Sequence, residues 1–138
     1  MTFSIIARNP KTGEIGGATA TGNLCVGGWV LRGNVDKGVT ATQGFYPSTI
    51  WGENILKILN KYPPTKAANK IIQRDKNKNY RQISCLNLKG QGFCFTGNKN
   101  IKYSDQIVLP NLVVCGNMLG NRNVVKKIVE NFKFKNES

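Results

Sequence analysis

The chain opens with MTFSIIAR at residues 1–8 and returns with IGGATAT at residues 15–21. The segment Phe3–Ala7 is rich in apolar and β-branched side chains, which is typical of a strand. Residues 9–13 (NPKTG) carry the proline and glycine of a tight turn. The sequence therefore predicts two successive N-terminal strands. The small side chains of the second indicate close approach of another backbone or of a ligand.

Strands and helices are expected in separate groups along the rest of the chain. The expected elements are strands at Leu24–Leu31 and Gly38–Gln43, a helix N-capped by Ser48 with Glu53 in an early turn, a helix from Pro63-Pro64, a hairpin of Arg81–Leu88 and Gly92–Thr96, a strand at Leu112–Cys115 and a helix over Val124–Phe132. Segregated strands and helices favour an α+β fold of packed layers over a doubly wound parallel sheet. The length of 138 residues suits one domain, residues 1–138.

The charge composition bears on whether the protein binds nucleic acid. Twenty Lys and Arg against seven Asp and Glu give a net charge of +13, which raises nucleic acid as a partner. The lysines between Lys57 and Lys78 are scattered, so we expect a solvated basic face. Any nucleic-acid binding should be weak, sequence-indifferent and lost by roughly 200 mM salt. No apolar run reaches the ~18–20 residues of a membrane span, and no signal-peptide pattern opens the chain, so we expect a cytoplasmic protein.

The cysteines predict neither a metal site nor a cofactor. Cys25, Cys85, Cys94 and Cys115 contain no C-x-x-C pair, and each lies in an apolar or alternating segment where a free thiol behaves as a small hydrophobe. A disulfide between Cys85 and Cys94 is geometrically conceivable across a hairpin, but free thiols are the expectation for a cytosolic chain.

The chain has no histidine. A hydroxyl nucleophile needs a neighbouring base, and imidazole is the usual one. The alternative is an N-terminal Ser, Thr or Cys whose own α-amine, with an ordinary pKa of roughly 7.7–8.0, takes the proton. Thr2 would supply that group once an aminopeptidase removes Met1. The competing interpretation is that Thr is simply a common second residue.

Polar residues beside glycine follow three expected strands, at Thr21-Gly22-Asn23, Thr42-Gln43-Gly44 and Gly116-Asn117-Met118. Rigid sheets position such turns for function. A backbone N–H at Gly44 could hold an oxyanion, and Arg32 could supply a cation near the nucleophile. Each also has a purely structural explanation: Gly44 and Asn117 as turn residues, Arg32 as a surface charge.

The sequence resembles a widespread bacterial family, domain of unknown function 1028, placed among the N-terminal nucleophile hydrolases. The matching strings occur in family order along the whole chain: residues 1–8, 20–33, 41–44, 47–53, 80–82, 95–97 and 116–119. The resemblance implies a four-layer αββα sandwich of two antiparallel sheets. It also implies Thr2 as nucleophile, oriented by Thr21 and Asn23, with Gly44 and Gln43 at an oxyanion turn and Arg32 loosely matching a cation.

Three functions remain open at this point. The first is an amide-bond hydrolase that uses Thr2, with Gln43 and Asn117 binding an unknown small-molecule or peptide substrate. The second is an inactive binding or assembly subunit, and the third is a basic nucleic-acid-binding domain. Family members usually continue beyond the segment that matches Val124–Phe132, so the resemblance also implies a shortened C-terminus, an exposed strand edge and self-association, most simply as a dimer.

Overall fold

β1 (Thr2–Arg8) is a central strand in the first of two antiparallel sheets. It pairs with β2 (Ile15–Thr21) on one side and with β8 (Leu112–Asn117) on the other, and β7 (Asp105–Leu109) pairs with β8. The computed structural model describes residues 1–134 and gives this sheet the order β2-β1-β8-β7. The expected N-terminal strand pair is therefore confirmed.

The second sheet has the order β3-β4-β5-β6. Its strands are β3 (Leu31–Asn34), β4 (Gly38–Gly44), β5 (Arg81–Asn87) and β6 (Gly92–Thr96), all antiparallel to their neighbours. β4 and β5 are central and almost fully buried, because helices cover one face and the first sheet covers the other. The expected strand at Gly38–Gln43 and the expected hairpin are both confirmed.

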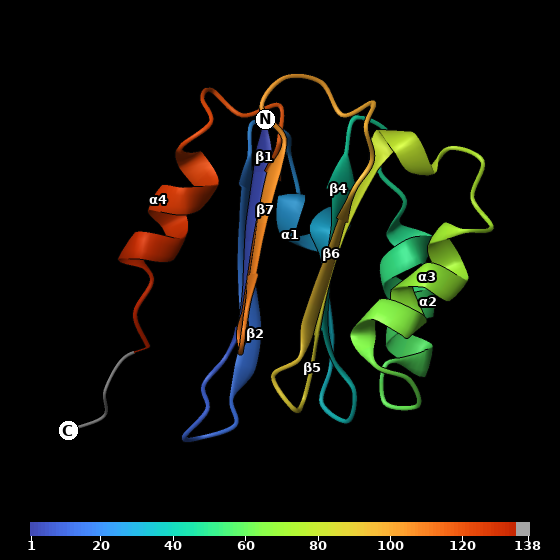
Figure 1. Cartoon of the computed structure of the whole chain (residues 1–138), viewed down its shortest axis with the longest axis vertical. Coiled ribbons are helices and arrows are strands. Elements are labelled where there is room, and N and C mark those ends of the chain that lie inside the picture. Colours follow the sequence, from blue (N-terminus) through green and yellow to red (C-terminus); the bar gives the residue numbers. More distant parts are fainter. Residues whose placement is uncertain (135–138) are drawn as a thin grey trace.

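Helices form the two outer layers (Figure 1). α2 (Thr49–Ile58) and α3 (Pro64–Ile72) lie on the second sheet, while α4 (Val124–Asn131) lies on β7 and β8 of the first. A 3₁₀ turn, η1 (Lys78–Tyr80), leads into β5. The protein is thus a four-layer α+β sandwich in the order helix, sheet, sheet, helix, as the family resemblance implies.

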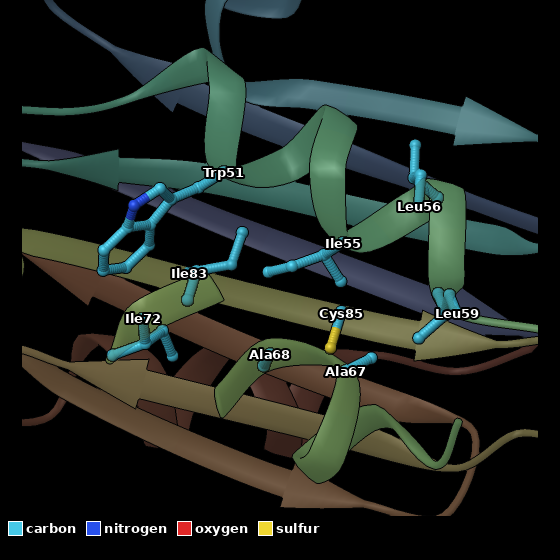
Figure 2. Packing of buried hydrophobic residues seen from close by; sticks show 9 residues of the cluster. All are labelled: Trp51, Ile55, Leu56, Leu59, Ala67, Ala68, Ile72, Ile83 and Cys85. Carbon is cyan, nitrogen blue, oxygen red and sulfur yellow. The ribbon is translucent and has the colours of Figure 1, made fainter. Parts of the chain in front are cut away.

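The largest apolar cluster lies between α2, α3 and the second sheet (Figure 2). Trp51 and Ile55 on α2, with Leu59 at its C-cap, meet Ile72 on α3 over Ile83 of β5. Each of these side chains is at most 3% exposed. Burying a side chain of this size contributes about 2 kcal/mol. The helical spacing of the apolar residues after Ser48 is therefore the spacing of a buried face.

The layer between the two sheets changes from apolar to polar along the strands. Ile6 and Val113 belong to its apolar part. Because alternate residues of a strand face the same side, Ile6 is followed toward the N-terminus by Ser4 and Thr2. Ser4 is buried and its Oγ lies 3.3 Å from Cys115 Sγ. The polar end of this layer is the end of the sandwich at which the chain begins (Figure 1).

The predicted strand at Leu24–Leu31 is wrong. Residues Val26–Val30 form a short helix, α1, which contacts β2, β3 and β4 at the edge of the sandwich. Cys25 precedes it with a left-handed φ of 57°, and Val30 is buried in the layer between the sheets. Five residues are too few for a helical period to appear in the sequence.

β7 is not among the elements that the sequence predicts. It is a five-residue edge strand in which three apolar residues follow one another (DQIVL), and Val108 and Leu109 are exposed, so it shows neither the alternation nor the burial by which a strand is recognised. Ser48 does occupy the N-cap of α2 but makes no side-chain capping hydrogen bond. Glu53 is outside the first turn of α2 and instead pairs with Arg32 at 3.4 Å.

All four cysteines are free thiols; Cys25 is exposed and the other three are buried. Within residues 1–134, no helix is both long and apolar enough to cross a membrane.

Candidate functional site

A cavity of about 620 Å³ opens at the polar end of the sandwich. It lies where β1 begins, where β2, β4 and β8 end, and beside the segment that leads into α2. Six of the seven residues singled out from the sequence line it: Thr2, Thr21, Asn23, Gln43, Gly44 and Asn117. They come from four separate segments of the chain, and the fold brings them to one place.

Thr2 lies at the floor of this cavity between two polar neighbours. It is in register with Thr21 of β2 and with Asn117 of β8. The Thr2 hydroxyl donates to Thr21 Oγ1 at 3.0 Å, and Thr21 Oγ1 donates in turn to the carbonyl of Met1 at 2.8 Å. A short chain of hydrogen bonds therefore links the Thr2 hydroxyl to the peptide bond that precedes it.

Opposite Thr2, the second sheet contributes a buried amide pair. Gln43 Nε2 donates to Gln82 Oε1 at 2.7 Å and to the Cys115 carbonyl at 3.4 Å. Gln82 Nε2 donates to Thr96 Oγ1 at 2.8 Å and to the Gly116 carbonyl at 3.0 Å. Gln82 is completely buried, so these contacts with both sheets fix its amide group.

The orientation of the Gln43 amide follows from that of Gln82. Both neighbours of Gln43 Nε2 are oxygen acceptors, and reversing the amide would set three oxygens against one another. Gln43 Oε1 therefore points away from Gln82, and it is buried with no hydrogen-bond partner among residues 1–134. Leaving a buried acceptor without a partner costs about 1–3 kcal/mol. A ligand that donates a hydrogen bond to Gln43 Oε1 would therefore bind favourably.

Gly44 begins the turn that forms one wall. Its φ is +135°, and a side chain there would lie 2.6 Å from the Tyr80 carbonyl oxygen, so only glycine fits. The N–H groups of the next two residues are already engaged. Phe45 N–H donates to Asn100 Oδ1 at 2.9 Å, and Tyr46 N–H donates to the Tyr80 carbonyl at 3.1 Å. The turn is therefore held firmly against the residues that flank β5.

The structure places Arg32 outside the cavity, contrary to the expectation of a cation near the nucleophile. Its Nη1 donates to the Gly28 carbonyl at 2.6 Å and to the Leu31 carbonyl at 2.8 Å, and its Nε pairs with Glu53. These contacts tie α1 to α2. Arg32 is a structural link between helices because its donors point at backbone carbonyls and at a helix side chain.

The cation that does line the cavity is Arg81. Its Nε donates to Asp75 Oδ2 at 2.6 Å, its Nη1 donates to the Tyr46 carbonyl at 2.7 Å, and its guanidinium lies over the rings of Tyr46 and Trp51. Burial raises the pKa of Asp75, but the Asn77 N–H and Arg81 outweigh it and hold that pKa below its ordinary value. Arg81 thus fastens the Gly44 turn to the start of β5.

Sequence reasoning missed Gln82 and Arg81 as residues of this site. Gln82 and Ser84 alternate with Ile83 and Cys85, which is the pattern of a strand with one solvated face. All of β5 is nevertheless buried, because the first sheet covers the polar face. A buried amide can be recognised from this pattern only once the second covering layer is known.

The described residues contain no group of three or more His, Cys, Asp or Glu side chains that could hold a metal ion. The polar groups that line the cavity are hydroxyls, amides, backbone N–H groups and the Arg81 guanidinium.

The chain is similar to known proteins along nearly all of its length. The model of a family described as "Family of unknown function (DUF1028)" matches residues 2–138. The crystal structure of protein SPO2555 from Silicibacter pomeroyi, assigned to the same family, superposes with a TM-score of 0.91 at 44% sequence identity. That match covers 94% of this chain and 57% of the other, so the chain spans little more than half of that protein's length. No curated protein matches. The chain belongs to the DUF1028 family, whose function is unknown.

Proposed function

We propose that this protein is an amide-bond hydrolase of the N-terminal nucleophile type, with Thr2 as its nucleophile. The observation that carries the proposal is the position of Thr2: the first residue of β1, at the floor of the cavity, with its hydroxyl 3.0 Å from Thr21 Oγ1. The chain has no histidine to act as the base, so the α-amine of Thr2 is the natural candidate.

Removal of Met1 would prepare the site. Met1 is more than half exposed and lines the cavity, so a peptidase could reach it. Its loss would free the Thr2 α-amine and would take away the carbonyl that Thr21 Oγ1 now contacts. Thr21 could then orient both the hydroxyl and the amine of Thr2, which is the role that the family resemblance implies for it.

The reaction runs in two halves. Thr2 Oγ1 attacks the amide carbonyl carbon while the α-amine takes the hydroxyl proton. The C–N bond breaks, and the amine product leaves with that proton. Water then attacks the ester, giving its proton to the α-amine, and the acid is released as the Thr2 oxygen regains a proton. No metal or cofactor is required for this cycle.

Gly44 and Asn117 are the groups we assign to the oxyanion. The N–H of Gly44 approaches without a side chain in the way, while those of Phe45 and Tyr46 are already bonded. Among residues 1–134, Asn117 Nδ2 makes one long contact, 3.4 Å to Gln82 Oε1, and retains donor capacity. Gln43 Oε1, which lacks a partner in the described chain, is placed to receive an N–H of the substrate or of the freed α-amine. Asn23 completes the rim.

An acylation experiment tests this function. The protein, purified after expression in a cell that contains methionine aminopeptidase, is treated with an activated 4-nitrophenyl ester, and the acylated peptide is located by mass spectrometry. We expect acyl transfer to the Thr2 oxygen, removable by hydroxylamine, in the wild type and in Thr2→Ser. We expect none in Thr2→Ala, whereas Thr65→Ala, at an exposed position of α3, should behave as wild type. Equal acylation of Thr2→Ala would refute the proposal.

A further inference from the structure

The walls of the cavity differ sharply from its floor. Within residues 1–134, seven of the twelve exposed large apolar side chains line this one cavity: Met1, Leu24, Trp29, Phe45, Tyr46, Ile50 and Met118. Trp29 is 63% exposed and Leu24 is 88% exposed. Scattered single apolar residues are ordinary on a surface, but a concentration around a concave site marks a binding surface.

The side chains of the cavity also offer little that could receive a charged ligand. Among the described residues that line it, none is acidic, none is a lysine, and the only charged side chain is Arg81. The Arg81 guanidinium already pairs with the Asp75 carboxylate through Nε, which offsets its charge, and Nη1 donates to the Tyr46 carbonyl. A carboxylate or an ammonium group held against these walls would lose hydration without gaining a partner. The lysines that give the chain most of its net charge of +13 therefore lie outside the described lining of the cavity.

The dimensions fit a small molecule better than a flat partner surface. A volume of about 620 Å³ lies within the range of ligand pockets, which are typically apolar with a few convergent polar groups. Here the polar groups are those of Thr2, Gln43 and Asn117 at the floor. Trp29, Phe45 and Tyr46 supply aromatic surface, which favours stacked or edge-on contact with another ring.

We infer that the ligand is a neutral amide that carries a bulky apolar group, preferably aromatic, with the amide at the polar floor and the apolar group against the rim. This inference rests on the proposed function for the reacting bond. It adds the substrate class: uncharged arylalkyl or long-chain acyl amides, and not substrates recognised through a carboxylate or ammonium group.

Binding can be measured separately from catalysis because of where the two tryptophans lie. Trp29 is at the rim, and Trp51 is 3% exposed in the helix-side core. In the Thr2→Ala variant, which removes the nucleophile, 4-phenylbutyramide should shift or quench the Trp29 emission in a saturable manner. Succinamic acid and acetamide should not do so at the same concentrations. The change in emission should disappear in the double variant Thr2→Ala, Trp29→Phe.

A rim variant with a matched control locates the binding. On the Thr2→Ala background, Phe45→Ala should weaken 4-phenylbutyramide binding about fivefold, since an aromatic contact contributes about 1 kcal/mol. Val35→Ala, equally apolar and 87% exposed but outside the cavity, should leave the affinity unchanged. Equal effects of the two variants would overturn the assignment of the rim.

Hydrolysis by the wild type separates this inference from the proposed function. Phenylbutyryl 4-nitroanilide should be cleaved faster than succinyl 4-nitroanilide. Binding of the neutral amide without any cleavage would contradict the hydrolase and leave the ligand class standing, whereas cleavage that favours the succinyl compound would contradict the ligand class alone. Trp29 emission that depends on protein concentration and not on the amide would show that the rim is a contact between copies of the chain, and would overturn the inference.

Discussion

At the residue scale, Arg81 connects the cavity to the rest of the fold. It holds the Tyr46 carbonyl on one side and Asp75 on the other, with both its own side chain and that of Asp75 largely buried. The Arg81–Asp75 pair therefore holds the turn after β4 through the hydrogen bond to the Tyr46 carbonyl. Sequence alone could not assign this role, because Asp75 and Arg81 flank a polar segment that reads as a loop.

The Asp75–Arg81 pair predicts a pH-dependent stability. The pKa of Asp75 is lowered in the folded state from an ordinary value of 3.8, so its stabilising contribution is present above about pH 4 and is lost as the pH falls through the lowered value. Asp75→Asn should reduce the unfolding free energy by about 2 kcal/mol at pH 7. The difference from wild type should shrink below pH 4 in urea melts.

A matched control is available on α4. Glu130 pairs with Lys126 at 3.6 Å on the exposed surface, so Glu130→Gln should cost less than about 1 kcal/mol. If Asp75→Asn lowers the unfolding free energy at pH 7 no more than Glu130→Gln does, the Asp75–Arg81 pair does not stabilise the fold as proposed.

The cysteines give a second prediction at the residue scale. Burial raises the pKa of the Cys85 thiol to about 12, and Cys94 and Cys115 are also buried, whereas Cys25 is exposed. A thiol reagent at pH 8 should therefore modify one cysteine rapidly in the folded protein and all four after denaturation. Peptide mapping should identify Cys25; rapid native labelling of Cys94 or Cys115 would show that the layer between the sheets opens readily.

At the scale of the elements, β4 and β5 carry the polar interior of the sandwich. Their alternation of polar and apolar residues identified them as strands, and the polar turn after β4 was recognised as a candidate site. The sequence could not reveal that their polar side faces a second sheet. Whether the polar side of a strand is solvated or buried depends on the layer that covers it. The first sheet covers this side of β5, so Gln82, which the pattern predicts at the surface, is buried.

Gln82→Met tests the amide pair. Methionine has a similar volume but removes the acceptor of Gln43 Nε2 and the donor to Thr96 and Gly116. We expect a loss of at least about 2 kcal/mol in unfolding free energy, because several buried groups lose a partner. Gln73→Met, at the exposed end of α3, is the control and should be close to neutral. A Gln82→Met protein as stable as wild type would mean that water replaces the amide.

The Leu24–Leu31 segment illustrates where element prediction fails. Its apolar residues and glycines suit a strand as well as a helix, and tertiary contacts decide the outcome. The left-handed Cys25 starts the turn, Val30 is drawn into the core, and Arg32 caps carbonyls near the helix end. None of these contacts is local enough to be read from a pattern.

At the scale of the whole molecule, the layer order followed from the grouping of strands and helices together with the family resemblance. The pairing of β1 with β8 did not follow, because it joins residues more than a hundred positions apart. This long-range pairing places Asn117 beside Thr2. The site is therefore a property of the topology, although its residues could be selected from the sequence.

The outer face of the first sheet predicts self-association. α4 covers β7 and β8, while a hollow of about 500 Å³ beside β2 is lined by Ile5, Ala7, Ile15, Phe132 and Phe134. We expect a dimer, most simply one with twofold symmetry, that covers this apolar surface. Sedimentation at micromolar concentration measures it, and Ala18→Lys on exposed β2 should shift the equilibrium toward monomer. A monomeric wild type that melts cooperatively above ~60 °C would contradict the expectation.

The central claim is that Thr2 becomes the N-terminal residue and acts as the nucleophile. The most direct measurement is the intact mass of the protein after expression in cells that contain methionine aminopeptidase. We predict a mass lower than that of the full sequence by one methionine residue, with threonine as the first residue in the N-terminal peptide. Complete retention of Met1 would leave Thr2 without a free α-amine, would contradict the hydrolase, and would favour a binding or assembly subunit built on the same fold.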